Sequence, residues 1–352
     1  MKLLPKKAPH IRSDVSNKTV MGDAVVTLAA LYFMAMCYHG YRAVHLGLVS
    51  VAVCWGADAL CVALRGRRVN LRDFSPVVTG MIIPLMMPAN IPYHVVVTAG
   101  LFAILVVKQP FGGLGSNLFN PAAGGIAFAT VCWSDLMFSY PLPSSGINFF
   151  GPVSATTSSS TAYTLYVGGV PMEDATSVLL GQLAGPMGAT GVLVICACLL
   201  YLLVRGTVRY QQSLLLLFTA AVLNFLFPRV AADGLTSAFY EVMATPVLFC
   251  AAFMFTDPVT SPGRNLGKAL YGVVGGVVMF LFSRFGGYEQ TTVFAILLMN
   301  AVSPALDSLA EWKVMKERRM RYGRQVSIDL TEGEGFGGEE DVPAAQAQEG
   351  GR

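Results

Sequence analysis

The residues of this chain that could do chemistry gather at two proline-containing breaks in otherwise apolar sequence. The first break, residues 73–80, reads DFSPVVTG, and the second, residues 256–262, reads TDPVTSP, roughly 180 residues later. Carboxylates and hydroxyls are costly in hydrocarbon unless they line a cavity or face protein, where they can bind an ion or a polar group. Matched breaks in two halves of a chain are typical of a membrane protein with an internal repeat and a binding site at the repeat interface.

The carboxylates at and near these breaks also have a structural interpretation. Asp73 and Asp257 lie beside the expected ends of half-helices, where a carboxylate can cap exposed backbone amides. The sequence leaves the capping and binding roles of these two residues equally open. Asp58 lies in the middle of an apolar segment, and for this residue a structural hydrogen bond is the favoured interpretation over a binding role.

Residues 106–122, VVKQPFGGLGSNLFNPA, form the richest local feature. Three glycines let the backbone turn and approach a ligand closely. A helix that starts near Asn120 would present unpaired amide groups to an anion or to a carbonyl-rich ring. The segment matches neither the Rossmann nor the Walker fingerprint, and on spacing alone a tight cytoplasmic turn is the favoured alternative.

Composition places these features in a polytopic membrane protein. The 352 residues are 54% hydrophobic and 13% charged, whereas a soluble domain carries about 25% charged residues. The seven cysteines all lie in apolar segments without metal-ligand spacing, so we expect small buried hydrophobes and no metal site. The lipid bilayer is the expected surrounding, and no nucleic-acid partner is expected.

A membrane span needs roughly 20 apolar residues, or fewer where neighbouring helices bury a broken one. Pro84 and Pro88 split the third of the expected segments, and a further break is expected in the sixth near Gly185-Pro186. Ten segments are predicted, at residues 20–39, 44–64, 74–90, 93–109, 118–138, 177–204, 210–227, 239–256, 266–284 and 290–309.

The placement of lysine and arginine predicts the orientation of these segments. With the N-terminus in the cytoplasm, all but three of the 24 Lys and Arg residues fall on the cytoplasmic side, the exceptions being Arg42, Arg229 and Arg284. Both termini are therefore predicted to be cytoplasmic. Because each half holds five segments, the second half would be inserted upside down. The predicted fold is an all-α membrane protein of two inverted five-helix repeats with broken helices.

These observations divide the chain into five parts. Residues 1–19 are a cytoplasmic N-terminal segment, and residues 20–138 form the first membrane repeat. Residues 139–176 form an extracytoplasmic loop rich in hydroxyl side chains, for which a flexible linker is the simplest interpretation. Residues 177–309 form the second repeat, and residues 310–352 form a cytoplasmic tail whose distal, acidic part is expected to be disordered.

Two classes of function are compatible with this pattern. One is a secondary transporter or channel with a solute site at the repeat interface. The other is a membrane subunit that holds a cofactor between its halves. The residues alone do not separate the two classes.

A family resemblance adds to this interpretation at residues 106–122. The run resembles the D subunit of the Rnf complex, an ion-translocating ferredoxin:NAD oxidoreductase, and its homologue, the B subunit of the sodium-translocating NADH:quinone reductase. The short N-terminal region is more similar to the Rnf-type subunit. Further segments that resemble family motifs follow in the expected order, at residues 8–13 (APHIRS), 73–80, 256–262, 285–288 (FGGY) and 295–300 (AILLMN).

The resemblance implies a multi-pass flavoprotein subunit in the bacterial inner membrane. Complexes of the family pass electrons between ferredoxin and NAD and couple this to sodium or proton export. The implied partners are the other subunits of the complex and a flavin transferase. A single subunit is not expected to be a complete enzyme, since the chain lacks a nicotinamide fingerprint and an iron–sulfur cysteine set. Neither the ion nor the direction of electron flow follows from the sequence.

The resemblance also implies flavin mononucleotide (FMN), joined through its phosphate to a Ser or Thr hydroxyl in the outward loop. The family's attachment motif falls on residues 154–162, with Ser160 at the modified position. The motif's Asp, Ala and Pro are replaced here, and Thr157 and Thr161 are alternative attachment residues. A subunit without covalent flavin, acting as a scaffold, is the third possibility.

A second, noncovalent flavin or riboflavin within the membrane is implied for relatives. Asp73, Asp257, Thr79 and Asn120 are predicted to line the inner flavin or ion site. Asp73 and Asp257 are predicted to lie on the ion pathway. The alternative without flavin is an inverted-repeat solute transporter or channel.

Overall fold

The computed structural model describes residues 17–67, 73–144, 149–229 and 233–333, with side chains described as far as residue 316. The chain falls into two compact units, Met1–Asp307 and Ser308–Arg352. The segment at residues 8–13 that resembles a family motif lies outside the described residues. So does the distal part of the tail, for which the sequence predicts disorder.

The first half of the chain is built from antiparallel and broken helices. Gly40, with a φ of 72°, makes the sharp turn between the first two of them. Pro76 lies in the first turn of α3, where its missing amide is tolerated, and Pro84 lies near the end of that helix. The helices are α1 (Asn17–His39), α2 (Tyr41–Leu64), α3 (Ser75–Leu85), α4 (Tyr93–Phe102) continuing into the π-helix η1 (Ala103–Lys108), α5 (Pro121–Cys132) and the short α6 (Ser134–Met137).

The second half repeats this mixture of long and broken helices. The break predicted near Gly185-Pro186 is confirmed, because residues 181–191 are not helical and separate two helices. The helices are α8 (Ala175–Leu180), α9 (Val192–Val204), α10 (Tyr210–Leu226), α11 (Gly234–Met243), α12 (Val247–Phe253), α13 (Asn265–Phe285) and α14 (Thr292–Gly333), of which α14 runs into the second unit.

Part of the hydroxyl-rich loop between the halves has regular structure. A two-residue strand, β1 (Tyr140–Pro141), pairs antiparallel with β2 (Thr157–Ser158). The short helix α7 (Thr161–Tyr166) follows directly, with Ser160 as its N-cap. The predicted attachment residues therefore belong to ordered elements.

Four of the described helices are long and apolar enough to cross a membrane, namely α1, α2, α13 and the Thr292–Lys316 part of α14. Helices α11 and α12 give a fifth candidate if they are counted as one span bent by 51°. The other five predicted segments are occupied by shorter apolar helices, because prolines and glycine-rich stretches end them early. The chain is thus a mostly helical membrane protein with four or five full-length spans and several broken ones.

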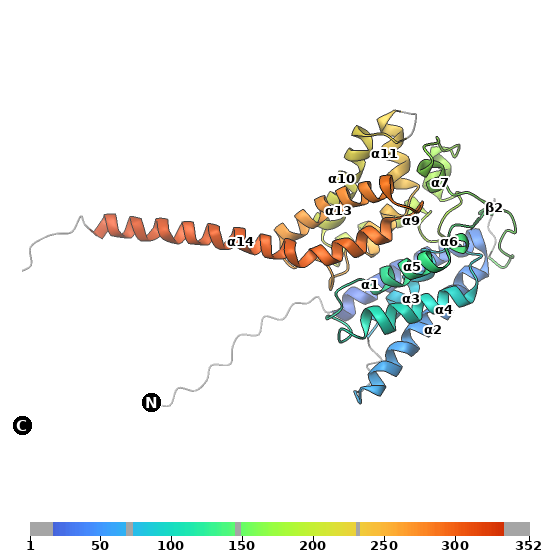
Figure 1. Cartoon of the computed structure of the whole chain (residues 1–352), viewed down its shortest axis with the longest axis horizontal. Helices are drawn as coiled ribbons and strands as arrows, with labels where there is room; N and C mark the ends of the chain where they lie inside the picture. Colours follow the sequence, from blue (N-terminus) through green and yellow to red (C-terminus); the bar gives the residue numbers. More distant parts are fainter. Residues whose placement is uncertain (1–16, 68–72, 145–148, 230–232, 334–352) are drawn as a thin grey trace, which may run out of the picture. The chain divides into compact units, whose positions relative to one another are not determined.

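Two groups of helices pack around these breaks (Figure 1). Helix α2 packs against α3 and α4, and α4 packs against α5; in the other group, α13 and α11 pack against α10. Gly272 and Gly276 let α13 approach α10 closely, since a Cβ at Gly276 would lie 2.8 Å from the carbonyl oxygen of Leu216. Helix α1 belongs to the first group because it packs against α2 and α3, and α12 belongs to the second because it packs against α10. Helix α9 contacts both α1 and α12 and so joins the two groups.

Candidate functional site

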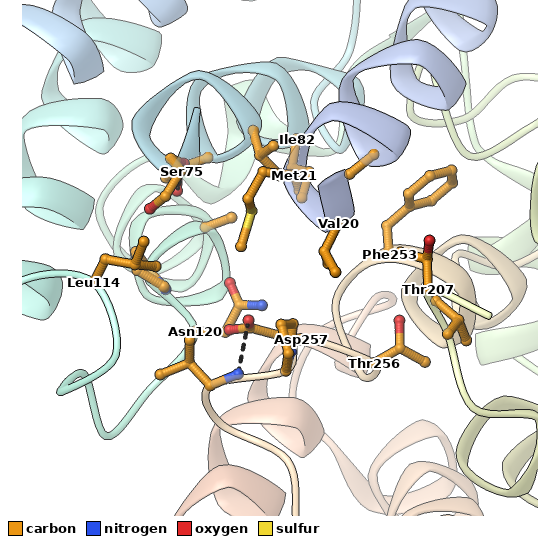
Figure 2. A pocket seen from close by; sticks show the side chains of 18 of the residues that line it. Val20, Met21, Ser75, Ile82, Leu114, Asn120, Thr207, Phe253, Thr256 and Asp257 are labelled. Carbon is orange, nitrogen blue, oxygen red and sulfur yellow. Dashed lines mark hydrogen bonds between the residues drawn. The ribbon is translucent and has the colours of Figure 1, made fainter. Parts of the chain in front are cut away.

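A small cavity lies where the broken helices meet, and we call it the inner pocket. Its volume is about 80 Å³. Figure 2 shows Met21, Ser75 and Ile82 on one side of it and Asn120 and Asp257 on the other. Five stretches of chain line it, within residues 20–24, 75–82, 108–122, 202–208 and 252–259.

The structure brings together three of the four residues predicted for the inner site. Thr79, Asn120 and Asp257 all line the inner pocket, although they are far apart in the sequence. Thr79 and Asn120 are buried, and Asp257 is half-buried. Residues from the two sequence breaks and from the glycine-rich segment thus line one cavity.

Asn120 holds the pocket wall together through three hydrogen bonds. Its side-chain oxygen accepts from the amide of Ala123 at 3.2 Å and so caps α5. Its side-chain nitrogen donates to the carbonyl of Met254 at 3.2 Å, just after α12. Its backbone amide donates to Asn300 Oδ1 at 2.9 Å, and Asn300 in turn donates to the Tyr271 hydroxyl. One asparagine therefore ties the first half of the chain to the second.

Asp257 combines a local structural role with access to the pocket. Its carboxylate accepts from the amide of Val259 and from the hydroxyl of Thr260, both at 3.3 Å. These contacts are long for charge-assisted hydrogen bonds, which are usually about 2.7–2.9 Å. The carboxylate organises the turn after α12 and still faces the cavity, where it could bind a cation or a proton.

Asp73 does not line the inner pocket. Its carboxylate accepts from the amide of Ser75 at 2.9 Å, at the start of α3. The capping role, one of the two left open by the sequence, is the one that the described contacts support. Its place on an ion pathway stays a prediction.

Asp58 belongs to a buried cluster beside the pocket. Its Oδ1 lies 3.0 Å from Lys108 Nζ and accepts from Gln109 Nε2 at 2.7 Å. Arg65 donates to both the side-chain and the backbone oxygen of Gln109. Asp58 therefore has the structural hydrogen-bond role that the sequence favoured.

Lys108 is the lining residue that sequence reasoning missed. The Lys and Arg count treats it as an ordinary cytoplasmic lysine, yet its side chain is 1% exposed and lines the pocket at the end of η1. Beyond the ion pair with Asp58, its Nζ makes no hydrogen bond within the described residues. The available signal was its position within residues 106–122, shortly before the first glycine, combined with the single carboxylate of Asp58 in an earlier apolar segment.

The glycine-rich segment itself forms the tight turn that spacing favoured. Gly112, Gly113 and Gly115 have φ values of 113°, 92° and 91°, which other residues rarely adopt. Leu114 and Asn117 from this turn reach the inner pocket. The glycines thus shape the wall of the site.

The size of the inner pocket limits what it can hold. Small-molecule and cofactor pockets measure about 300–1,000 Å³, while a buried water needs about 10–15 Å³. At about 80 Å³ the pocket fits an ion with its ligands or a few waters, and a flavin ring does not fit in this conformation. The prediction that Thr79, Asn120 and Asp257 contact a flavin would require the surrounding helices to part.

The predicted attachment residues differ in their accessibility. Ser160 is 1% exposed, and its hydroxyl accepts from the amide of Tyr163 at 2.9 Å and donates to Glu289 Oε1 at 3.0 Å. Thr161 is fully buried, whereas Thr157 in β2 is exposed. A transferase could reach Thr157 directly, but it could reach Ser160 only if the start of α7 opened.

Comparison with known proteins gives a consistent result over most of the chain. Residues 5–316 match the NQR2, RnfD, RnfE family. The D subunit of the ion-translocating oxidoreductase complex of Halorhodospira halophila is 29% identical, over 91% of this chain and 97% of that protein. The D subunit of the Na(+)-translocating ferredoxin:NAD(+) oxidoreductase complex of Acetobacterium woodii is 28% identical, over 89% and 95%. The proton-translocating counterpart of Clostridium ljungdahlii is 26% identical, over 86% and 93%.

Proposed function

The chain belongs to the NQR2, RnfD, RnfE family, and on this basis we propose that it is the D-type subunit of an ion-translocating ferredoxin:NAD oxidoreductase complex. The observation that carries the proposal is the match over nearly the whole membrane region, whose helix breaks converge on one cavity with polar groups in a mostly apolar lining. Relatives are named for sodium and for proton translocation alike, so the ion stays open.

The proposal includes the inverted repeat and the predicted orientation. All five stretches that line the inner pocket lie at helix ends that the Lys and Arg count places on the cytoplasmic side. Residues 134–138, at the outer end of the fifth predicted segment, contribute to a second hollow together with residues 159–166 and 287–289, which are predicted to be extracytoplasmic. Asn120 and Asn300, which lie 180 residues apart, hydrogen-bond directly. These groupings support an alternating topology with two related halves that meet at the inner pocket.

In this function the inner pocket serves ion movement. Asp257 supplies a carboxylate and Thr79 and Asn120 supply neutral oxygens or amides at a cavity of ionic size. The buried Lys108–Asp58 ion pair next to the pocket adds two fixed charges, which interact electrostatically with a cation that enters. The residues therefore suit a small ion or proton better than a cofactor.

We further propose that electrons pass through FMN bound covalently in the loop of residues 139–176. A bound flavin supplies reversible electron transfer, which the chain's own side chains do not. Thr157 is the exposed candidate for the phosphoester, and Ser160 and Thr161 require the N-terminal turn of α7 to open. A noncovalent inner flavin, if present, requires a wider inner pocket.

Purification of the tagged chain from its native membrane tests this function. We expect co-purification of the other oxidoreductase subunits, yellow protein, in-gel flavin fluorescence that survives denaturation, and an FMN adduct on the peptide of residues 140–176 by mass spectrometry. Co-purification without an adduct would favour the scaffold role. Absence of both partners and flavin, with solute uptake into liposomes, would favour the transporter alternative and contradict the proposal.

A further inference from the structure

A second hollow lies among the segments predicted to face outward. Its volume is about 550 Å³, and we call it the acidic hollow. It is lined by the carboxylates of Asp135 and Glu289 and by four aromatic rings, Phe138, Tyr163, Tyr166 and Tyr288. No lysine or arginine is among its described lining residues.

The two carboxylates of the hollow, Asp135 and Glu289, lack an ion-pair partner in the part of the chain that the structure describes. Asp135 is exposed, while Glu289 is partly buried and accepts a hydrogen bond from Ser160. Burial raises the pKa of Glu289 to about 7, against the lowering effect of hydrogen bonds from Ser160 and Tyr140. A carboxylate in this state gains from an approaching cation.

The aromatic walls favour the same kind of ligand. Tyr288 lies near Phe138, with ring centroids 5.9 Å apart, and stacks on Phe294 at 5.8 Å. The ring of Tyr166 already binds a cation from within the chain, since the guanidinium carbon of Arg229 lies 5.2 Å from its centroid. Ring faces attract Lys and Arg, most strongly where water is partly excluded.

The sign of the charge decides between possible occupants. A free phosphate ion or another small free anion deep in the hollow would lie against two carboxylates that have no ion pair within the described residues, and it would be repelled. An arginine can instead stack on an aromatic ring and pair with a carboxylate through two hydrogen bonds. The volume exceeds that of one side chain, so the hollow has room for the neighbouring residues of a partner segment as well.

We propose that the acidic hollow receives an arginine or lysine side chain from another subunit of the complex. The proposal rests on the proposed function, because it needs a partner on the outward face of the membrane. It assigns to Asp135, Glu289 and the surrounding rings a docking role that is separate from the inner pocket.

Photo-cross-linking in the intact complex tests this assignment. A photoactivatable phenylalanine analogue replaces Tyr163, whose ring is 45% exposed at the hollow. We expect cross-links to another subunit within a few residues of an arginine or lysine, mapped by mass spectrometry. Asp135→Asn combined with Glu289→Gln should lower the cross-link yield at least threefold, and raising the salt concentration should lower it in the unsubstituted complex.

Asp174→Asn is the matched control. Asp174 is exposed, lies in the same loop of residues 139–176 as the probe position Tyr163, and does not line the hollow. It should leave the yield unchanged. If the double variant assembles poorly, Asp135→Arg alone serves, since Asp135 is exposed and its replacement should not disturb folding; the yield should again fall.

Four outcomes would overturn the proposal. Three are cross-links to lipid alone, cross-links to a partner segment without a basic residue, and a yield that the neutral and reversed charges leave unchanged. The fourth is a flavin adduct recovered at the photo-probe, which would assign the hollow to a cofactor. Failure of the chain to co-purify with any oxidoreductase subunit would instead remove the proposed function. Co-purification of the other subunits without the expected cross-links from position 163 would contradict only the docking role.

Discussion

The buried cluster of Asp58, Lys108 and Gln109 beside the inner pocket and the acidic hollow differ in how their carboxylates are paired. Beside the inner pocket, Asp58 has a lysine at 3.0 Å and a glutamine amide at 2.7 Å. In the acidic hollow, Glu289 has only hydroxyl donors, and Asp135 has no ion-pair partner within the described residues. The first arrangement is complete within one chain, whereas the second leaves a charge for something else to neutralise. The comparison indicates that the Asp58–Lys108 pair is complete within the chain, and it supports the proposal that the acidic hollow binds a cation from a partner.

The largest effect is expected from breaking the Lys108–Asp58 ion pair, which is complete within the chain. Lys108→Met leaves the buried Asp58 carboxylate without its cation, and removing one partner of a buried pair typically costs about 3–5 kcal/mol. We expect a strongly lowered melting temperature in detergent or nanodiscs. Lys316→Met, at an exposed position in the second unit, is the control and should melt like the unsubstituted protein.

A double substitution distinguishes the charge pair from simple packing. Replacing Asp58 by Asn in the Lys108→Met background removes the stranded charge and should restore part of the lost stability. If the double variant were no more stable than Lys108→Met alone, the ion pair would not be the cause of the loss.

The next effect concerns the contact between the two halves at the inner pocket. Asn300→Ala removes the acceptor of the buried Asn120 amide, and an unsatisfied buried donor costs about 1–3 kcal/mol. Thermal unfolding measures the loss. Asn300→Asp keeps an acceptor and serves as the comparison, although it introduces a charge. Equal stability of Asn300→Ala and the unsubstituted protein would show that this contact does not hold the halves together.

Asp257→Asn tests whether the inner pocket moves ions. The substitution retains one side-chain oxygen, which can still accept from the amide of Val259, replaces the oxygen that accepts from Thr260 with an NH2 group, and removes the charge that faces the cavity. We expect ion-coupled turnover of the purified complex to fall about tenfold, equivalent to about 1.4 kcal/mol, with assembly preserved. Lost assembly with no selective loss of turnover would assign Asp257 to the turn alone.

The sequence predicted much of the inner site because the relevant residues interrupt apolar segments. The breaks containing Thr79 and Asp257 and the turn before Asn120 stand out against hydrocarbon-compatible sequence, and all three converge. The predicted fold class is confirmed as far as a mostly helical membrane protein with broken helices, while the inverted repeat stays a prediction. Two contributions were not visible, the burial of Lys108 and the narrowness of the cavity, because both depend on how the helices pack.

The acidic hollow was not predicted, and the reason is physical. Asp135 lies in the short helix α6, Tyr166 ends α7 within the loop of residues 139–176, and Glu289 lies between α13 and α14, so nothing in their spacing indicates that they meet. The preference for Ser160 as attachment residue considered motif position alone. The structure adds that the Ser160 hydroxyl caps α7 and bonds Glu289, which leaves its modification a prediction that needs a local opening.

Ser160 can be tested with two substitutions that separate capping from modification. Ser160→Ala removes the N-cap of α7 and the bond to Glu289, at a cost of about 1 kcal/mol. Ser160→Asn should retain most of the cap but cannot form a phosphoester. Loss of covalent flavin fluorescence in both variants would identify Ser160 as the attachment residue. Fluorescence retained in both would exclude it and direct attention to Thr157.

The smallest effect sharpens the comparison through pH. Glu289 binds its proton more tightly in the folded chain, with a pKa of about 7 against an ordinary value of 4.5, so the stability of the isolated subunit should fall as pH rises between these values. Glu289→Gln removes this pH dependence. The free energy of unfolding of the variant, compared with that of the unsubstituted subunit, should therefore be about 1 kcal/mol more favourable at pH 8 than at pH 4.5, after allowance for partial exposure. Melting temperatures across this range measure it. In the assembled complex a partner's cation would lower the pKa of Glu289, so the difference in pH dependence between the unsubstituted protein and Glu289→Gln should shrink. An equal pH dependence in the isolated subunit and in the complex would mean that no cation reaches the hollow.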